Sequence, residues 1–156
     1  VIKNFLDFLK KKKIFPEIIV HLRPTTPLRD YSLIDKAIKF FVNNKKYTSL
    51  RSVHKMSETA FKSLRISKTN ILKPIINKYK NLDKVNLSRQ LYPATYQANG
   101  YIDIYRTNNI LKNKTLLGEK SYPFITDFQV ELDTLDDLDY LNFKINKKKN
   151  LKKKIF

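Results

Sequence analysis

The sequence predicts an α/β domain with a mainly parallel sheet and a β-rich segment inserted in its middle. Three observations carry this prediction. The apolar run at residues 17–23 is typical of a strand buried on both faces. Helical apolar stripes lie on either side of it, and residues 55–98 show no long helical period. The chain of 156 residues, 42% of them hydrophobic, is long enough for one domain with a real core.

The N-terminal third predicts two helices and two strands in alternation. A stripe with spacing i, i+3, i+4 and i+7 predicts a helix over residues 2–13, which Pro16 ends. A second stripe predicts a helix over residues 32–44, where Ser32 and Asp35 fit a capping box. A strand at residues 47–54 then completes a strand–helix–strand unit, for which we expect a right-handed crossover.

The middle of the chain predicts an arm that forms a dimer. Its strand-like pieces "FKSLRI" and "ILKPII" carry apolar side chains that no helix in the same segment can cover. These residues are Phe61, Leu64, Ile66, Ile71, Leu72, Ile75 and Ile76. Because an exposed apolar patch of this kind usually marks an interface, we expect a homodimer through residues 55–98.

The rest of the chain returns to the α/β pattern. We expect a strand at 101–105, a short helix at 107–113 and a strand pair within "YPFITDFQVELD". A last helix is predicted at 134–146, with Thr134 and Asp137 as its cap. Residues 1–54 and 99–146 are thus two parts of one core, and residues 147–156 are a basic tail.

Composition excludes several classes of protein and site. The chain has no cysteine, hence no disulfide, no thiolate metal site and no cysteine nucleophile. No apolar run approaches the length of about 18 residues that a membrane helix needs, and no secretory signal is visible, so we expect a cytoplasmic protein. The net charge of +18 comes largely from short lysine runs, which are usually solvated, so nucleic acid is not the expected partner.

Two segments place polar groups where a ligand could bind. In "VHLRPTTPLRD" a buried strand ends in a polar turn stiffened by Pro24 and Pro27, and ligands of doubly wound folds bind at such strand ends. A plain connecting turn explains this segment equally well. Arg89 and Gln90 precede Asn99 and Gly100 by ten residues, and Gly100 is one of only two glycines, which indicates positive φ or close backbone approach.

A third segment, "FQVELDTLDD", suggests a metal site. Glu131 and Asp133 lie two residues apart on the expected strand, so both carboxylates should face the same side. Like charges so placed repel each other unless a cation lies nearby, and a hard divalent ion with oxygen ligands is the usual answer. The alternative is an edge strand with a solvated face.

Taken in order, "LRPTTPLRD", "RQLYPATYQANGYIDIY" and "VELDTLDDL" resemble the acylneuraminate cytidylyltransferases, which activate sialic, legionaminic and pseudaminic acids. The resemblance implies a Rossmann-like fold of the nucleotide-diphospho-sugar transferase type and a homodimer with an inserted dimerisation arm. It also implies CTP and a nine-carbon acidic sugar (a nonulosonic acid) as substrates, pyrophosphate as a product and Mg²⁺ as the cofactor.

The resemblance assigns a role to each matching residue. Asp133 and Glu131 would bind the metal, and Asp133 is the firmer ligand because the family commonly has aspartate at both positions. Arg89 would act in catalysis, together with Asp133, and would also bind substrate. The remaining substrate-binding residues would be Arg23, Lys62, Gln90, Tyr96 and Asn99, with Lys62 reaching from the arm into the partner's active site.

The family's N-terminal CTP-binding loop, of the form R-x-G-S-K, is absent from the 156 residues. We therefore expect an N-terminally truncated chain that is inactive or poorly active. Asp103, Leu116 and Leu117 stand where sialic acid enzymes often carry aromatics, which favours another nonulosonic acid. Two alternatives remain: a 3-deoxy-octulosonate cytidylyltransferase, whose expected Q-G-D turn is replaced by "RPTTP", and a non-enzymatic basic module that binds nucleic acid or another anion.

Overall fold

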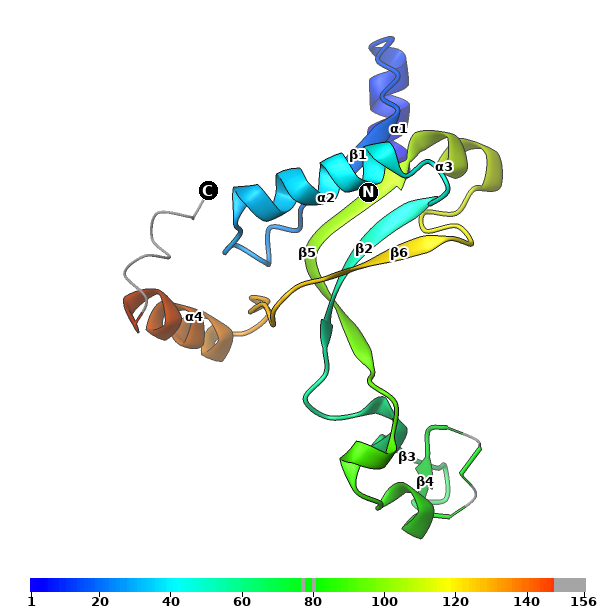
Figure 1. Cartoon of the computed structure of the whole chain (residues 1–156), viewed down its shortest axis with the longest axis vertical. Helices are drawn as coiled ribbons and strands as arrows, with labels where there is room; N and C mark the ends of the chain where they lie inside the picture. Colours follow the sequence, from blue (N-terminus) through cyan, green and yellow to red (C-terminus); the bar gives the residue numbers. More distant parts are fainter. Residues whose placement is uncertain (77, 80, 148–156) are drawn as a thin grey trace.

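The computed structural model describes residues 1–76, 78–79 and 81–147, so all of the predicted basic tail except Lys147 lies outside the described residues. The core contains four α-helices and four strands among these residues (Figure 1). The helices are α1 (Ile2–Lys11), α2 (Tyr31–Asn43), α3 (Thr107–Asn113) and α4 (Leu135–Lys147). The strands of the main sheet are β1 (Ile18–His21), β2 (Ser49–Lys55), β5 (Tyr96–Arg106) and β6 (Ser121–Ile125). The α/β class is confirmed, and every predicted helix is present.

The sheet is mixed, which corrects the prediction of a mainly parallel sheet. The strand order is β1-β5-β2-β6, and β5 is antiparallel to both of its neighbours, whereas β2 and β6 are parallel. Between β2 and β5 the chain runs out into the arm and returns to the end of the sheet that it left. β5 therefore runs back along β2, and because its other edge pairs with β1, it lies between the two strands of the predicted strand–helix–strand unit. This architecture is consistent with a Rossmann-like fold but is not specific to it.

The two faces of the sheet are covered by different helices because side chains alternate along a strand. On one face, α2 packs on Leu50, Ile102 and Ile104 through the residues Ile34, Ala37 and Phe41. On the other face, α1 places Ile2 and Leu6 against a second cluster, formed by Ile19, Tyr105 and Ile110. These apolar contacts fix the sheet between the two helices.

The helix caps agree with the prediction at one helix and differ at another. Asp30 caps α2, because its carboxylate accepts from the Ser32 backbone N–H at 2.9 Å; the predicted capping box at Ser32 and Asp35 is therefore wrong. At α4 the predicted cap is confirmed. Asp137 accepts from the backbone N–H of Thr134 at 2.9 Å, and Thr134 Oγ1 accepts from the Asp137 N–H at 3.2 Å.

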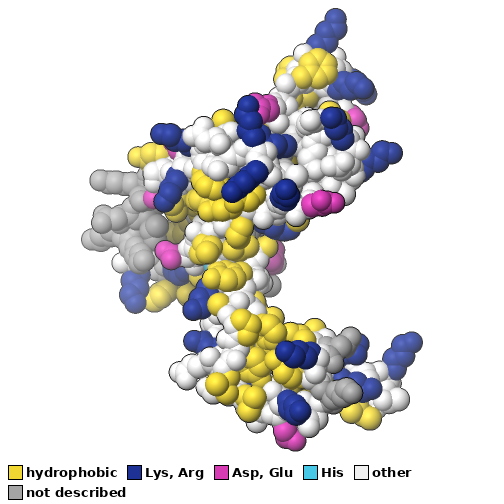
Figure 2. All heavy atoms as spheres, turned by 45° about the vertical axis from the view of Figure 1, so that its right-hand side comes forward, with side chains coloured by type: hydrophobic (Ala, Val, Ile, Leu, Met, Phe, Trp, Pro, Cys, Tyr) yellow, Lys and Arg dark blue, Asp and Glu magenta, His cyan; other side chains and the backbone are white. Residues whose placement is uncertain are grey.

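The arm leaves the core as a ribbon formed by the ends of β2 and β5 (Figure 1). It holds a hairpin of β3 (Leu64–Ile66) and β4 (Leu72–Pro74), together with three short 3-10 turns, η1 (Ala60–Lys62), η2 (Asp83–Val85) and η3 (Arg89–Leu91). Hydrophobic side chains gather on its surface (Figure 2), among them Ile66 and Leu91, which are 69% and 70% exposed. The exposed surface is consistent with a dimer interface, and the homodimer itself stays a prediction.

The segment after β6 departs from the predicted strand pair. Only Ser121–Ile125 forms a strand, and residues 126–134 follow an irregular path. This path is held by the Leu132 N–H, which donates to the Thr25 carbonyl at 2.8 Å, so the segment pairs with the turn after β1 instead of with a strand. In the described part of the chain, no helix is long and apolar enough to cross a membrane.

Candidate functional site

The three polar segments singled out in the sequence meet at Gly100. This glycine has φ +62°, the left-handed conformation that side chains disfavour. A Cβ placed on it would lie 2.8 Å from Glu131 Oε1, 2.9 Å from Thr26 Oγ1 and 3.1 Å from Arg23 Cδ. One backbone position is therefore surrounded by the turn after β1, by β5 and by the segment after β6. We call Arg23, Thr26, Asn99, Gly100 and Glu131 the Gly100 cluster.

Asn99 fixes the local path of β5 at this cluster. Its side chain is buried, with the amide nitrogen donating to Thr126 Oγ1 at 2.6 Å and Oδ1 accepting from the Tyr101 N–H at 3.3 Å. Thr26 Oγ1 in turn donates to the Asn99 carbonyl at 3.5 Å. The predicted role of Asn99 in sugar binding stays a prediction; in the structure its amide joins β5 to the end of β6.

Arg29 holds the turn after β1 in place. It is buried, and its guanidinium donates to the carbonyl of Tyr101 at 2.9 Å, to that of Gly100 at 3.4 Å and to that of Arg23. Burial lowers its pKa, although these carbonyl dipoles and the Tyr101 ring still favour the cation. Arg29 therefore ties the turn to β5 and keeps the backbone of Arg23 next to Gly100.

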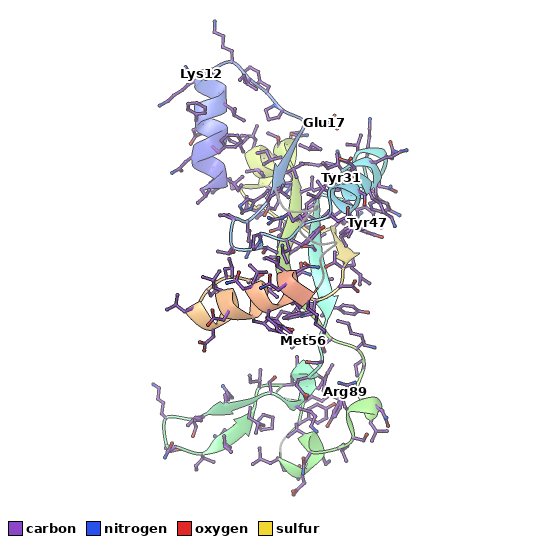
Figure 3. All side chains as sticks on the ribbon, turned by 90° about the vertical axis from the view of Figure 1, so that its left-hand side faces the viewer. Lys12, Glu17, Tyr31, Tyr47, Met56 and Arg89 are labelled. Carbon is purple, nitrogen blue, oxygen red and sulfur yellow. The ribbon has the colours of Figure 1, made fainter. Side chains whose placement is uncertain are left out.

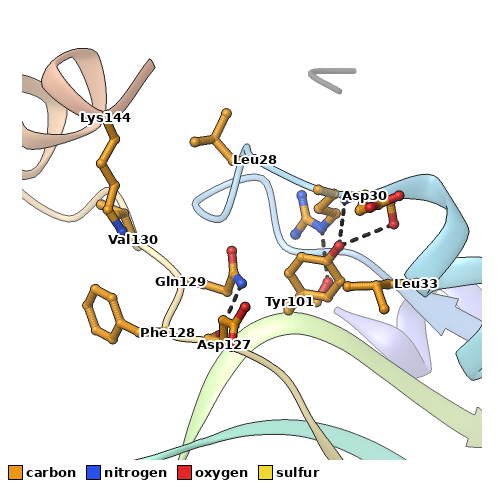
Figure 4. Close-up of a pocket in the computed structure, with 10 residues that line it drawn as sticks. Leu28, Asp30, Leu33, Tyr101, Asp127, Phe128, Gln129, Val130 and Lys144 are labelled. Carbon is orange, nitrogen blue, oxygen red and sulfur yellow. Dashed lines mark hydrogen bonds between the residues drawn. The ribbon is translucent and has the colours of Figure 1, made fainter. Parts of the chain in front are cut away.

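A cavity of about 230 Å³ adjoins this cluster through Arg29 and Tyr101 (Figure 4). Asp30 and Leu33 of the α2 end line one side, and the Tyr101 hydroxyl accepts from the Asp30 N–H at 2.6 Å. The opposite side is formed by residues 127–130 and by Lys144 of α4. The cavity therefore offers the carboxylates of Asp30 and Asp127 and the lysine Lys144 beside apolar walls, a mixture that suits a polar organic ligand.

The two predicted metal ligands lie in irregular chain, which corrects their placement on a strand. Glu131 is half-buried against Gly100, and Asp133 is exposed beside the cap of α4. Among the described residues, no group of three or more His, Cys, Asp or Glu side chains could hold a metal. Both side chains are oxygen donors of the type that Mg²⁺ uses together with water and phosphate oxygens, because this ion rarely sits in an all-protein cage. Their role as metal ligands stays a prediction.

The remaining predicted site residues lie in the arm or at its base. Lys62 is in η1, Arg89 and Gln90 are in η3, and Tyr96 opens β5. Arg89 donates to the Ser57 carbonyl and lies in the arm beyond Met56 (Figure 3). No hydrogen bond or ion pair within the described ranges joins Lys62, Arg89 or Gln90 to the Gly100 cluster.

Three residues of the site were not singled out from the sequence. Thr26 and Arg29 lie inside the segment "LRPTTPLRD", where an arginine next to a buried strand end was the available signal. Thr126 follows β6 and has no sequence signal, since a lone threonine after a strand is common. Its place beside Asn99 depends on the pairing of β6 with β2.

Comparison with known proteins yields two similar curated proteins. The chain is 29% identical over 137 residues to an N-acylneuraminate cytidylyltransferase of Escherichia coli O18:K1:H7 (strain RS218 / NMEC), covering 85% of this chain and 30% of that protein. It is 27% identical over 142 residues to the post-translational flagellin modification protein B of Campylobacter coli, covering 90% of this chain and 57% of that protein. The chain thus spans less than two thirds of either relative. No protein-family model matches it.

Proposed function

We propose that this chain is the acidic-sugar-binding part of a cytidylyltransferase that transfers CMP from CTP to a nine-carbon acidic sugar. The observation that carries the proposal is the convergence of three segments on Gly100. These are the segments that resemble the acylneuraminate cytidylyltransferases, and a protein with that name is among the relatives. The broader class of nucleotidyltransferases is supported by the name of this relative.

In this reaction the sugar hydroxyl releases its proton to solvent and its oxygen attacks the α-phosphorus of CTP. A new P–O bond forms to the sugar, and the bond between the α-phosphorus and its bridging oxygen breaks to release pyrophosphate. Catalysis of such a transfer depends mainly on positioning and on charge neutralisation. The rigid turn around Arg29 and the close packing at Gly100 would provide the positioning, and Arg23 would provide positive charge for the acidic sugar.

Mg²⁺ would be held by Asp133 and Glu131 together with substrate oxygens, and when bound it would neutralise phosphate charge. Glu131 already packs on Gly100, so its carboxylate lies beside the sugar-binding turn. Asp133 is the better placed of the two for a hydrated ion, because it is exposed. The exposure of Asp133 also leaves room for the phosphates that complete the coordination.

Lys62, Arg89 and Gln90 would serve the active site of a second copy of the chain. They lie on the arm, in η1 and η3, and within the described ranges no hydrogen bond or ion pair joins them to the Gly100 cluster of their own chain. A homodimer through the arm would bring these cations to the partner's substrate, where an arginine fork suits a phosphate or a carboxylate. The exposed apolar surface of the arm would supply the contact area.

The test is ligand binding to the 156-residue chain, measured by calorimetry or by ligand-observed NMR. We expect nine-carbon acidic sugars to bind, a neutral sugar not to bind, and the acidic-sugar affinity to persist at 0.3 M salt, on the order of twice physiological ionic strength. Pyrophosphate release from CTP should be slow or absent, since residues 1–156 contain no R-x-G-S-K loop. Failure of every nine-carbon acid to bind would contradict the proposal. Selective binding of 3-deoxy-octulosonate, or salt-sensitive binding of nucleic acid, would favour one of the two alternatives.

A further inference from the structure

We propose that Arg51, which lies in none of the three segments, is the second cation of an oxyanion-binding site that it forms with Arg23. Asp103 is the positioning residue that holds the two guanidinium groups side by side. The ligand is an oxyanion, either the carboxylate of the acidic sugar or a phosphate of the nucleotide. This inference rests on the proposed function for the identity of the ligand, whereas the anion site itself rests on the geometry.

The cluster is built by the register of three neighbouring strands. Asp103 in β5 lies opposite His21 in β1 and opposite Arg51 in β2, so the three residues form one row across the sheet. This row belongs to the face on which α1 packs, and the buried cluster of α1 contains Ile19 and Tyr105 of the neighbouring row. At the Asp103 row, Arg23 and Arg51 lie beside the carboxylate.

Asp103 is enclosed by the two arginines. Its side chain is only 3% exposed, and Arg23 Nη2 and Arg51 Nε each lie 3.6 Å from one of its two carboxylate oxygens. One negative charge between two positive charges leaves the cluster with a net positive charge. The arginine side chains are 37% and 32% exposed, so this positive charge faces the solvent.

Within the described ranges, these two arginines pair with Asp103 at 3.6 Å but donate no hydrogen bond. Arg51 Nε is buried and has no hydrogen-bond partner among these residues. By contrast, Arg106 donates to the carbonyls of Phe41, Asn44 and Tyr47, and Arg29 is similarly bonded to backbone. A guanidinium carries five N–H donors in a planar fork, the geometry that binds carboxylates and phosphates. The arginines at Asp103 therefore differ from the structural arginines of the same sheet.

Asp103 is itself held in place from the same strand. The pKa of the Tyr105 hydroxyl is raised to about 12, first by burial and then by the charge of Asp103 and a hydrogen bond to it. The cluster also connects to the candidate site, because Arg23 Cδ packs against Gly100 while its Nη2 faces Asp103. An anion bound between the arginines would thus lie beside the sugar-binding turn.

The experiment compares ligands and variants on the 156-residue chain, with affinities measured by calorimetry. The ligands are a nine-carbon acidic sugar, its methyl ester, CMP and inorganic phosphate. Arg51→Gln should lower the affinity for the acid at least about tenfold and leave the affinity for the ester unchanged, since a charge-assisted bidentate contact is lost. Arg51→Lys should bind the acid with an affinity between those of the wild type and Arg51→Gln, because lysine keeps the charge but not the planar fork. Arg65→Gln, at an exposed arginine of β3, makes the same charge change and should have no effect.

Asp103→Asn tests positioning. This variant should lower the affinity for the acid and not that for the ester, whereas a merely structural defect would lower both affinities. If CMP and phosphate respond to Arg51→Gln and the acid does not, the oxyanion is the phosphate. If phosphate alone binds and depends on Arg51, the anion site stands and the proposed function fails. The proposal is overturned if the affinity for none of the anions depends on Arg51. It is also overturned if a folded variant loses affinity for the acid and the ester equally.

Discussion

Substituting Gly100 by alanine perturbs the point at which the three segments meet. The residue has φ +62°, and an added Cβ would lie under 3.0 Å from two side-chain oxygens, those of Glu131 and Thr26. Glu131 can move away, because its carboxylate is the end of a flexible chain. Thr26 cannot, because it is β-branched and almost fully buried. We therefore expect the turn after β1 to shift relative to β5.

The cost has two parts. A non-glycine residue in the left-handed region loses about 1–2 kcal/mol, and crowding a packed site adds about 1 kcal/mol or more. The variant should therefore be about 2–3 kcal/mol less stable, which leaves a domain of ordinary stability folded. Its affinity for the acidic sugar should fall by about tenfold or more, because Arg23 and Glu131 both leave their positions.

Denaturant unfolding and calorimetry measure the two effects, and Gly118→Ala is the matched control. Gly118 also has positive φ, +67°, and its added Cβ would lie 2.7 Å from Thr48 Oγ1 and 2.8 Å from Asn109 Oδ1. It should lose similar stability but bind the sugar normally, because it precedes β6 at the opposite end of the sheet. Normal binding by Gly100→Ala, or equal loss of binding by both variants, would refute the assignment of the site.

The remaining predictions concern the metal, the α4 cap and the arm. Asp133→Asn should abolish the protein-dependent enhancement of water-proton relaxation by Mn²⁺, while Glu131→Gln should only weaken it; an enhancement that survives both changes would exclude this metal site. Thr134 and backbone N–H groups lower the pKa of Asp137, so its stabilising effect should be present above the ordinary carboxyl pKa and disappear as pH falls through the lowered one. Unfolding midpoints of wild type and Asp137→Asn should then converge in acid. Ile66→Asp with Ile75→Asp should convert a dimer into monomers in sedimentation, and a monomeric wild type would contradict the arm interface.

The helices could be predicted from the sequence because their apolar stripes are local. Residues with 3.6-residue spacing must share a face whatever the rest of the chain does, and the α4 cap needs only Thr134 and Asp137. The cap of α2 was misplaced because two capping patterns overlap there. Asp30 precedes Ser32, and its carboxylate accepts the hydrogen bond from the Ser32 backbone N–H, so Asp30 is the N-cap.

The strand pairing could not be predicted in the same way. The apolar alternation of Phe128, Val130 and Leu132 imitates a strand, but these residues pack irregularly: Phe128 makes an edge contact with the His54 ring, 5.1 Å between centroids. The position of β5 between β1 and β2 depends on contacts between residues more than 80 apart in sequence, such as Ile18 and Arg106. No local pattern encodes such a pairing.

The candidate site was predicted in part for the same reason. Segments that would meet could be picked out by their polar residues, and Gly100 could be recognised as a special backbone position. The row formed by His21, Asp103 and Arg51 could not, because each residue lies on a different strand and the row exists only once the register is set. Arg51 therefore carries no local sequence signal of its role.

The reversed direction of β5 explains why the site still lies where strand ends predict it. β1, β2 and β6 all run toward the same end of the sheet, and β5 starts from that end. The turn after β1, the Asn99–Gly100 pair near the start of β5 and the segment after β6 are therefore neighbours. The arm also leaves from this end, because the end of β2 pairs with the start of β5 there. A ligand that binds at the carboxyl ends of parallel strands would meet a site made from four strands instead of three, since the antiparallel strand contributes its amino-terminal half.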